Sequence, residues 1–230
     1  MGQRMNILAI ETVTMNCAVG VSVDGQQSLR ILDTERHHTE ALMPGIVDLL
    51  ADHGLTLRDL DRVVVDQGPG QFTGMRVGLA TAEALAQAVG AELVGVTSTE
   101  LHAQQLWADG HRGVALAIID ARRHELFVEV FTLGDEGVTS TSPPQVRTAR
   151  DLLIEWGTSG APAIITGDGV SAELTTLSAV PNFTVVPNDI PSLAAALRLG
   201  ETRSAGPVSA LYLRDADAVA NFTVRTRANS

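Results

Sequence analysis

The same order of structural elements is expected twice in this chain, about 100 residues apart. In the first half, an apolar strand at residues 7–10 ends in Glu11 and is followed by a polar turn and a second strand at residues 18–23. In the second half, an apolar strand at residues 114–119 ends in Asp120 and is likewise followed by a turn and a strand. Each half then continues with a helix, a buried strand, a glycine-containing loop and another helix. Such a repeat indicates two subdomains whose strand ends face each other across a cleft.

This α/β layout resembles the actin-like ATPase (ribonuclease H-like) fold of sugar kinases and heat-shock ATPases, in which two duplicated mixed-sheet subdomains face a cleft. A Walker P-loop fold is the competing interpretation, but it needs a GxxxxGK sequence and the chain contains no lysine. A hydrophobic content of 45% over 230 residues is enough for a packed core in both halves. We expect subdomains at residues 1–101 and 102–214, followed by a tail at residues 215–230.

Capping residues and apolar spacing place the other elements. Thr39, Thr73 and Thr148 are each expected to cap a helix, because a threonine side chain accepts hydrogen bonds from first-turn amides. Pro44 must lie in or near the first turns of its helix, or kink it. The helices are expected at residues 39–53, 73–89 and 149–156, and further strands at residues 28–32, 63–65, 92–94 and 163–165.

Charge and residue usage exclude several classes of function. A formal net charge of −11 and a pI near 4.9 oppose tight binding to the phosphate backbone of nucleic acid. All 16 basic residues are arginine, which excludes a P-loop lysine, a Schiff-base lysine and a Ser-Lys dyad. The six histidines show no His-x-x-x-His spacing, so we expect no metal site. The single cysteine, Cys17, forms no intramolecular disulfide and is expected in the core.

The chain is expected in the cytoplasm and not in a membrane. No stretch approaches the roughly 20 consecutive apolar residues of a membrane span. The first ten residues, MGQRMNILAI, contain no apolar signal region that ends in a small-residue cleavage site.

The most specific local feature is the glycine-rich loop DQGPGQFTG at residues 66–74. Its glycines permit positive φ and close backbone approach, its proline stiffens the turn, and the helix that it starts can point free amides outward. Such a loop can cradle an anion, which makes Gly68 and Gly70 weak candidates for cofactor binding, or it can be a rigid connection. The residues expected to set its geometry are Gly68, Pro69, Gly70, Phe72, Thr73 and Gly74.

Two turns are expected to face each other across the cleft. In the actin-like fold, the turn after the first strand approaches nucleotide phosphates and its strand-end acid orients the metal, a position that Glu11 takes here, with Thr12 and Thr14 in the turn. Equally, Glu11 can accept hydrogen bonds from the amides of its own turn. The second-half turn can contact the cleft or a partner, or can be a solvated hairpin tip. Its charged residues are Asp120, Arg122, Arg123 and Glu125.

The helix after the glycine loop carries little charge. Its only charged residues are Arg76 and Glu83, and small residues spread around its circumference. A helix with one solvent-facing side should carry more charge, so we expect this helix to be covered on two sides. The helix from Thr39 is also apolar on more than one stripe. We therefore expect a partner interface, with burial by the other half of the same chain as the alternative, made of Leu42, Met43, Ile46, Val47, Leu50, Met75, Arg76, Leu79, Ala82 and Glu83.

Five segments, in order, resemble the TsaB (YeaZ) family of bacterial tRNA threonylcarbamoyladenosine biosynthesis. The resemblance runs over nearly the whole chain. One departure is Gln71, where a serine is commoner, which puts any hydroxyl contact there in doubt. The five segments are ILAIET at Ile7, RHHTEALMPGI at Arg36, GPGQFTGMRVG at Gly68, DARRHELFVEVF at Asp120 and ALYLRDADAV at Ala210.

The resemblance implies a non-catalytic accessory subunit with no catalytic residue, no metal and no tightly bound cofactor. Members of the family pair with the catalytic paralogue TsaD, recruit the ATPase TsaE and form a homodimer when alone. They meet tRNA only through the complex. That complex uses ATP, and transfers the threonylcarbamoyl group of an adenylate made by TsaC to the adenosine beside the anticodon.

The catalytic paralogue is the sharpest alternative because it shares the glycine loop. Its family carries a metal-binding His-x-x-x-His pair after the helix that follows this loop, whereas residues 95–102 here, GVTSTELH, offer only His102. An independent enzyme of the metallo-glycopeptidase or small-molecule kinase type is a further alternative, and so is a homodimeric nucleotide sensor. Both would bind ATP or metal tightly as isolated chains.

Overall fold

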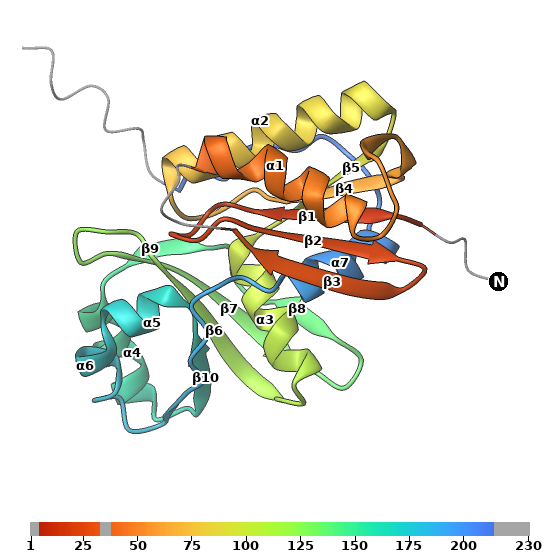
Figure 1. The fold of residues 1–230 in the computed structure, drawn as a ribbon. Coiled ribbons are helices and arrows are strands. Elements are labelled where there is room, and N and C mark those ends of the chain that lie inside the picture. The colour runs from red at the N-terminus through yellow and green to blue at the C-terminus, as the bar shows by residue number, and fades with distance from the viewer. Residues whose placement is uncertain (1–4, 33–37, 214–230) are drawn as a thin grey trace, which may run out of the picture.

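The first half of the chain forms a five-stranded mixed sheet. The computed structural model describes residues 5–32 and 38–213, and Figure 1 shows this sheet above the second one. Its strand order is β3-β2-β1-β4-β5, in which β1, β2 and β3 pair antiparallel while β4 and β5 continue the sheet in parallel. The strands are β1 (Ile7–Glu11), β2 (Ala18–Val23), β3 (Gln26–Ile31), β4 (Arg62–Asp66) and β5 (Glu92–Val96).

The second half repeats this topology. The order of the second sheet is β11-β10-β6-β7-β8, with β9 also paired to β7; β6, β7 and β8 are antiparallel, and β10 and β11 are parallel to β6. Each half therefore places its first strand between an antiparallel second strand and a parallel later strand, β4 in the first half and β10 in the second. This confirms the predicted duplication and the actin-like fold. The strands are β6 (Gly113–Asp120), β7 (Leu126–Leu133), β8 (Val138–Ser140), β9 (Gln145–Arg147), β10 (Ala163–Thr166) and β11 (Phe183–Val185).

Helices cover both faces of the first sheet. Figure 1 shows α1 and α2 side by side on its outer face, while α7 lies on the opposite face. The helix α3 packs on β6 and β7 of the second sheet. The helices are α1 (His38–Ala51), α2 (Phe72–Val89), α3 (Ser98–Ala108), α4 (Ala149–Ser159), α5 (Asp168–Ala172), α6 (Leu174–Leu177) and α7 (Leu193–Thr202), with a 3-10 turn at Leu57–Asp59.

Strand alternation explains the two cores of the first half. Successive side chains of a strand point to opposite faces, so Leu8 and Ile10 of β1 pack under α1 and α2. Ile7 and Ala9 pack on the other face, in the cluster that contains α7. Because β1 is buried on both faces, its sequence is a continuous apolar run.

The helix α7 corrects the predicted domain boundary. It belongs by sequence to the expected subdomain at residues 102–214, but its apolar side packs on β1, β2 and β4 of the first sheet. Arg62 Nη1 donates to the carbonyl of Gly200 at 2.6 Å, and Arg203 pairs with Glu100. The C-terminal segment therefore closes the first subdomain. The predicted tail at 215–230 lies outside the described residues, as do Arg36, His37 and the last six residues of the ALYLRDADAV segment.

Of the three predicted caps, the one at Thr148 is confirmed. Its hydroxyl accepts from the amide of Asp151 at 3.1 Å, and Asp151 bonds back to it in a capping box. Thr39 lies inside α1, which begins at His38. Thr73 lies inside α2, whose N-cap is Gln71, because the Met75 amide already donates to the Gln71 carbonyl at 2.9 Å. Pro44 also lies inside α1, beyond its first turn.

Gly78 and Gly157, both inside helices, give a matched pair of substitutions. An added Cβ at Gly78 would meet Thr12 Oγ1 at 2.3 Å, whereas nothing lies within 4 Å of one at Gly157. We expect Gly78→Ala to lower the free energy of unfolding by about 1–3 kcal/mol through overpacking. Gly157→Ala should raise it by up to about 1 kcal/mol through helix propensity. Urea denaturation measures both, and a Gly78→Ala protein as stable as the wild type would contradict the close packing.

Candidate functional site

The glycine loop lies closed against the turn that follows β1. The amide of Gln71 donates to the carbonyl of Val13 at 2.7 Å. A Cβ on Gly70 would lie 2.4 Å from Val13 Cγ1, so only glycine fits there. Gly68 has a φ of 98°, in the left-handed region that glycine adopts without strain. Contacts within the chain therefore account for Gly68 and Gly70, which favours the rigid connection over the anion cradle.

A buried acid, Asp66, fixes the start of the loop. Its carboxylate accepts from the amide of Gly68 at 2.9 Å and from Ser98 Oγ at 2.8 Å. Burial raises the pKa of Asp66 well above its usual range, and the Glu11 carboxylate raises it further. Asp66 is not among the predicted site residues, although it follows an apolar strand just as Glu11 does. Through these hydrogen bonds, the Asp66 carboxyl group connects the start of the glycine loop to the start of α3.

Glu11 is used inside its own turn. Its Oε1 accepts from the amide of Val13 at 2.7 Å and from that of Thr14 at 3.1 Å, and its side chain is fully buried. Thr12 Oγ1 donates to the carbonyl of Gly74 at 2.8 Å, which ties the turn to α2. Burial raises the pKa of Glu11 to about 7, against the lowering effect of the turn's hydrogen bonds. Glu11 therefore accepts hydrogen bonds from the amides of its own turn, which was the alternative to a role in orienting a metal.

The second-half turn is a charged and strained hairpin. Asp120 accepts from the amide of Arg122 at 2.7 Å and pairs with its Nη1 at 2.9 Å. Arg122, Arg123 and His124 have φ values of 63°, 58° and 61°, three consecutive non-glycine residues in the left-handed region. Hydrogen bonds across the turn offset the strain of this conformation. One of them runs from the amide of Glu125 to the carbonyl of Arg122 at 3.1 Å.

Arg122 of the second-half turn contacts Gln71 of the glycine loop and so links the two halves. With its amide oxygen turned toward these donors, Gln71 accepts from Arg122 Nη2 at 3.1 Å and from the amide of Met15 at 3.3 Å. Gln71 therefore bridges the turn after β1 and the second-half turn. On the second-half side, Asp168 Oδ1 accepts from the amide of Asp120 at 2.9 Å. Burial raises the pKa of Asp168 to about 6.

The part of the chain that the structure describes contains no cluster of three His, Cys, Asp or Glu residues able to hold a metal ion. His102, the histidine of the GVTSTELH stretch, lies fully buried in α3. Its two ring nitrogens have no hydrogen-bond partner, and burial lowers its pKa to about 4, which keeps the ring neutral. Cys17 is buried, as expected for a core residue. Within 5–32 and 38–213, no helix is both long and apolar enough to span a membrane.

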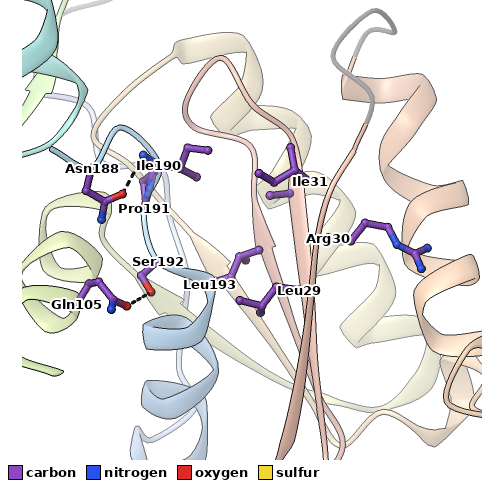
Figure 2. A pocket seen from close by; sticks show the side chains of 10 residues that line it. Leu29, Arg30, Ile31, Gln105, Asn188, Ile190, Pro191, Ser192 and Leu193 are labelled. Atoms are coloured by element: carbon purple, nitrogen blue, oxygen red, sulfur yellow. Dashed lines mark hydrogen bonds between the residues drawn. The ribbon is translucent and has the colours of Figure 1, made fainter. Parts of the chain in front are cut away.

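A hollow of about 510 Å³ lies between β3 and the segment before α7. Figure 2 shows Leu29, Ile31 and Leu193 gathered around it, while Arg30 points away, where it pairs with Asp52. The polar side chains of its wall bond among themselves; Ser192 Oγ, for example, lies 2.5 Å from Gln105 Oε1. Apart from Arg30, the lining residues are uncharged, so the hollow lacks groups for acid–base chemistry.

The structure corrects more than half of the predicted interface. On both helices one apolar stripe faces the chain's own sheet, and a residue buried there cannot anchor another chain. The residues buried in this way are Leu42, Ile46, Leu50, Met75, Leu79 and Ala82. Met43, Val47, Arg76 and Glu83 reach the surface. We define the docking face as the exposed residues Met43, Val47, Phe72, Arg76, Ala80 and Glu83.

The docking face combines apolar side chains with a hollow. Met43 is 36% exposed, Val47 46% and Phe72 40%, values that are high for large apolar residues. Between the two helices lies a hollow of about 460 Å³. Its lining residues are Thr39, Phe72, Thr73, Arg76, Val77, Ala80 and Thr81. An apolar surface with a recess and an arginine is typical of a protein–protein contact.

Comparison with known proteins identifies the family. A family model described as TsaD, tRNA N6-adenosine threonylcarbamoyltransferase, matches residues 32–199. The chain belongs to this family. Among its relatives, the Escherichia coli tRNA threonylcarbamoyladenosine biosynthesis protein TsaB is 33% identical over 134 residues, which are 58% of each chain. The match therefore spans little more than half of that relative.

Other proteins are similar to comparable extents. The Mycobacterium bovis protein Mb3455c is 36% identical over 156 residues, 65% of this chain and 68% of its own length. The solved structure of YeaZ from Pseudomonas aeruginosa has a TM-score of 0.72 at 22% identity, covering 85% of this chain and 90% of that chain, and shows the shared fold. The predicted resemblance to the TsaB (YeaZ) family is thus confirmed.

The raised pKa of Glu11 predicts a pH-dependent effect of Glu11→Gln. The folded state holds this proton up to about pH 7, while the unfolded chain releases it near 4.5, so ionisation of Glu11 destabilises the fold progressively as pH rises between those values. Glutamine resembles the protonated form. At pH 8 we expect Glu11→Gln to be more stable than the wild type by up to about 3 kcal/mol, and at pH 4 to be equal to it.

Chemical denaturation at several pH values measures this difference. Glu136→Gln is the matched control, because Glu136 lies exposed in a surface turn and loses the same charge. A Glu11→Gln protein that is less stable than the wild type at pH 8 would show that the turn amides stabilise the ionised carboxylate by more than burial destabilises it.

Proposed function

We propose that this chain is a non-catalytic scaffold subunit of the complex that transfers a threonylcarbamoyl group to the adenosine beside the anticodon of tRNA. One observation carries the proposal: the chain belongs to the threonylcarbamoyltransferase family, yet the acids expected to face its cleft are engaged by hydrogen bonds and an ion pair within the protein. Glu11 and Asp66 are buried and bonded within their own half, and Asp120 is paired with Arg122. The name of the Escherichia coli relative supports the same pathway.

The proposed partners follow from the family and from charge. The catalytic paralogue TsaD would supply the metal site and the transfer chemistry, and the ATPase TsaE would join the complex, which uses ATP. The isolated chain would hold no nucleotide tightly, because the glycine loop packs on Val13. With a net charge of −11 it would meet tRNA only through its partners. A role in tRNA modification also argues for the cytoplasm.

The docking face is the proposed contact with another actin-like chain. The side of α2 that faces away from its sheet carries only Arg76 and Glu83 as charged residues, together with small side chains such as Ala80. A solvent-facing helix of 18 residues normally carries more charge. The same face would bind a second copy of the chain when alone and the paralogue when it is present.

Charge along α2 fits self-association. Arg76 and Glu83 are seven residues apart, which is about two helical turns, so both point to the same side. In an antiparallel pair of α2 helices related by a two-fold axis, Arg76 of one copy lies opposite Glu83 of the other. Ala80 lies near the centre of that crossing, and its small side chain permits close approach.

Charge exchange tests this geometry. Arg76→Glu and Glu83→Arg, each alone, should weaken self-association roughly tenfold, because like charges then face each other twice per dimer. The double variant should bind more tightly than either single variant, and so should an equimolar mixture of the two single variants. Sedimentation equilibrium measures the affinities. Additive weakening in the double variant would exclude the antiparallel α2 arrangement.

The function itself is tested by depletion in the cell of origin, followed by mass analysis of tRNA nucleosides. We expect threonylcarbamoyladenosine to fall strongly and to return when the wild-type chain is supplied. Unchanged nucleoside levels would refute the scaffold role. Calorimetry of the isolated chain with ATP and Mg²⁺ separates the scaffold from an independent enzyme, since micromolar nucleotide binding with turnover would favour the enzyme.

A further inference from the structure

The ALYLRDADAV segment begins in a strap that crosses three parts of the molecule. We define the strap as residues 203–213, which follow α7. Its path is fixed at both ends: the amide of Gly206 donates to the carbonyl of Leu93 at 3.2 Å, and that of Leu211 donates to the carbonyl of Gln67 at 2.8 Å. Between these points, Val208 and Ala210 pack against the core under α1 and α2. The strap therefore runs beside β5 and ends at the glycine loop.

Three consecutive strap residues reach three different places. Leu211 bonds to the glycine loop through its amide. Tyr212 reaches α2, and Leu213 packs against Ile119 and Phe127 of the second half. The strap thus joins the docking face, the loop and the second sheet within one short segment.

Tyr212 holds the central arginine of the docking face. Its hydroxyl accepts from Arg76 Nε at 2.8 Å. The guanidinium carbon of Arg76 lies 3.7 Å from the centre of the Phe72 ring, and the rings of Phe72 and Tyr212 are 5.4 Å apart. Arginine stacked on one aromatic ring and bonded to another loses much of its rotamer freedom before any partner arrives.

The exposure of this cluster indicates a contact and not a core. Tyr212 is 47% exposed, although it is the only tyrosine in a chain with 3% aromatic residues. Tyrosine and arginine together dominate the energetics of many protein interfaces. The cluster borders the hollow that Phe72 and Arg76 line, and is continuous with the docking face.

We propose that Tyr212 is a positioning residue of the docking face: it presets Arg76 for a carboxylate of a second copy of this chain, Glu83 in the antiparallel arrangement of α2. This inference rests on the proposed function, which supplies the docking face. It adds a residue from the far end of the sequence to an interface otherwise built by α1 and α2. Because Leu213 is anchored on the second half, the strap also links docking to the arrangement of the two subdomains.

Removal of one oxygen tests the proposal. Tyr212→Phe keeps the ring stacking and removes the hydrogen bond, so self-association measured by sedimentation equilibrium should weaken roughly threefold to tenfold. Ser209→Ala, at an exposed strap position, is the matched control and should leave the affinity unchanged. Thermal melting of each protein, at concentrations low enough for it to be monomeric, shows whether the substitution affects the stability of the fold itself.

A double-mutant cycle separates positioning from general weakening. In an Arg76→Ala background, Tyr212→Phe should have no further effect on affinity, because there is no guanidinium left to position. If the wild type and the Tyr212→Phe variant self-associate with equal affinity, the role of Tyr212 is overturned and the docking face is unaffected. Additive losses in the cycle would also overturn it. A wild-type chain that forms no dimer at any concentration would overturn the self-association and this inference together.

Discussion

The contact between the turn after β1 and the glycine loop is the constraint on which the rest of the structure depends. Val13 fills the space above Gly70, and Thr12 fills the space beside Gly78, so two elements from different parts of the first half lie in van der Waals contact. This contact fixes where α2 begins and which side of it faces the sheet. The side of α2 that faces away from the sheet then contributes to the docking face.

Buried acids maintain this contact at a cost. Glu11 and Asp66 lie within the first half with raised pKa values, so the fold keeps two carboxyl groups in an environment that disfavours their charged forms. Each is compensated by amides or hydroxyls of the loops that it organises. Burial of a carboxyl group of this kind is typical of active sites, but here the hydrogen-bond partners of both carboxyl groups lie in the chain's own turns and at the start of α3. Glu11 and Asp66 therefore act as anchors for loops.

The repeat and the order of elements along the chain could be predicted from sequence because they depend on local apolar periodicity. The interface residues could not, because two apolar stripes on one helix look alike until the sheet is placed. Leu42 and Met43 are neighbours in sequence, yet one is buried and the other lies on the docking face. Likewise the bridge from Gln71 to Arg122 and the return of α7 to the first sheet depend on long-range packing. Thr148 capped its helix as predicted, because capping is local.

The strap shows why an interface in such a chain need not coincide with its helices. A helix supplies side chains at fixed intervals, so α2 places Phe72 and Arg76 one turn apart but cannot by itself fix a long arginine side chain. A residue from outside the helix is needed to restrict it. Tyr212 meets that need because the hydrogen bond of Leu211 to the glycine loop holds the backbone beside α2. The loop that begins as a candidate ligand site thus aligns both parts of the docking face, the start of α2 and the end of the strap.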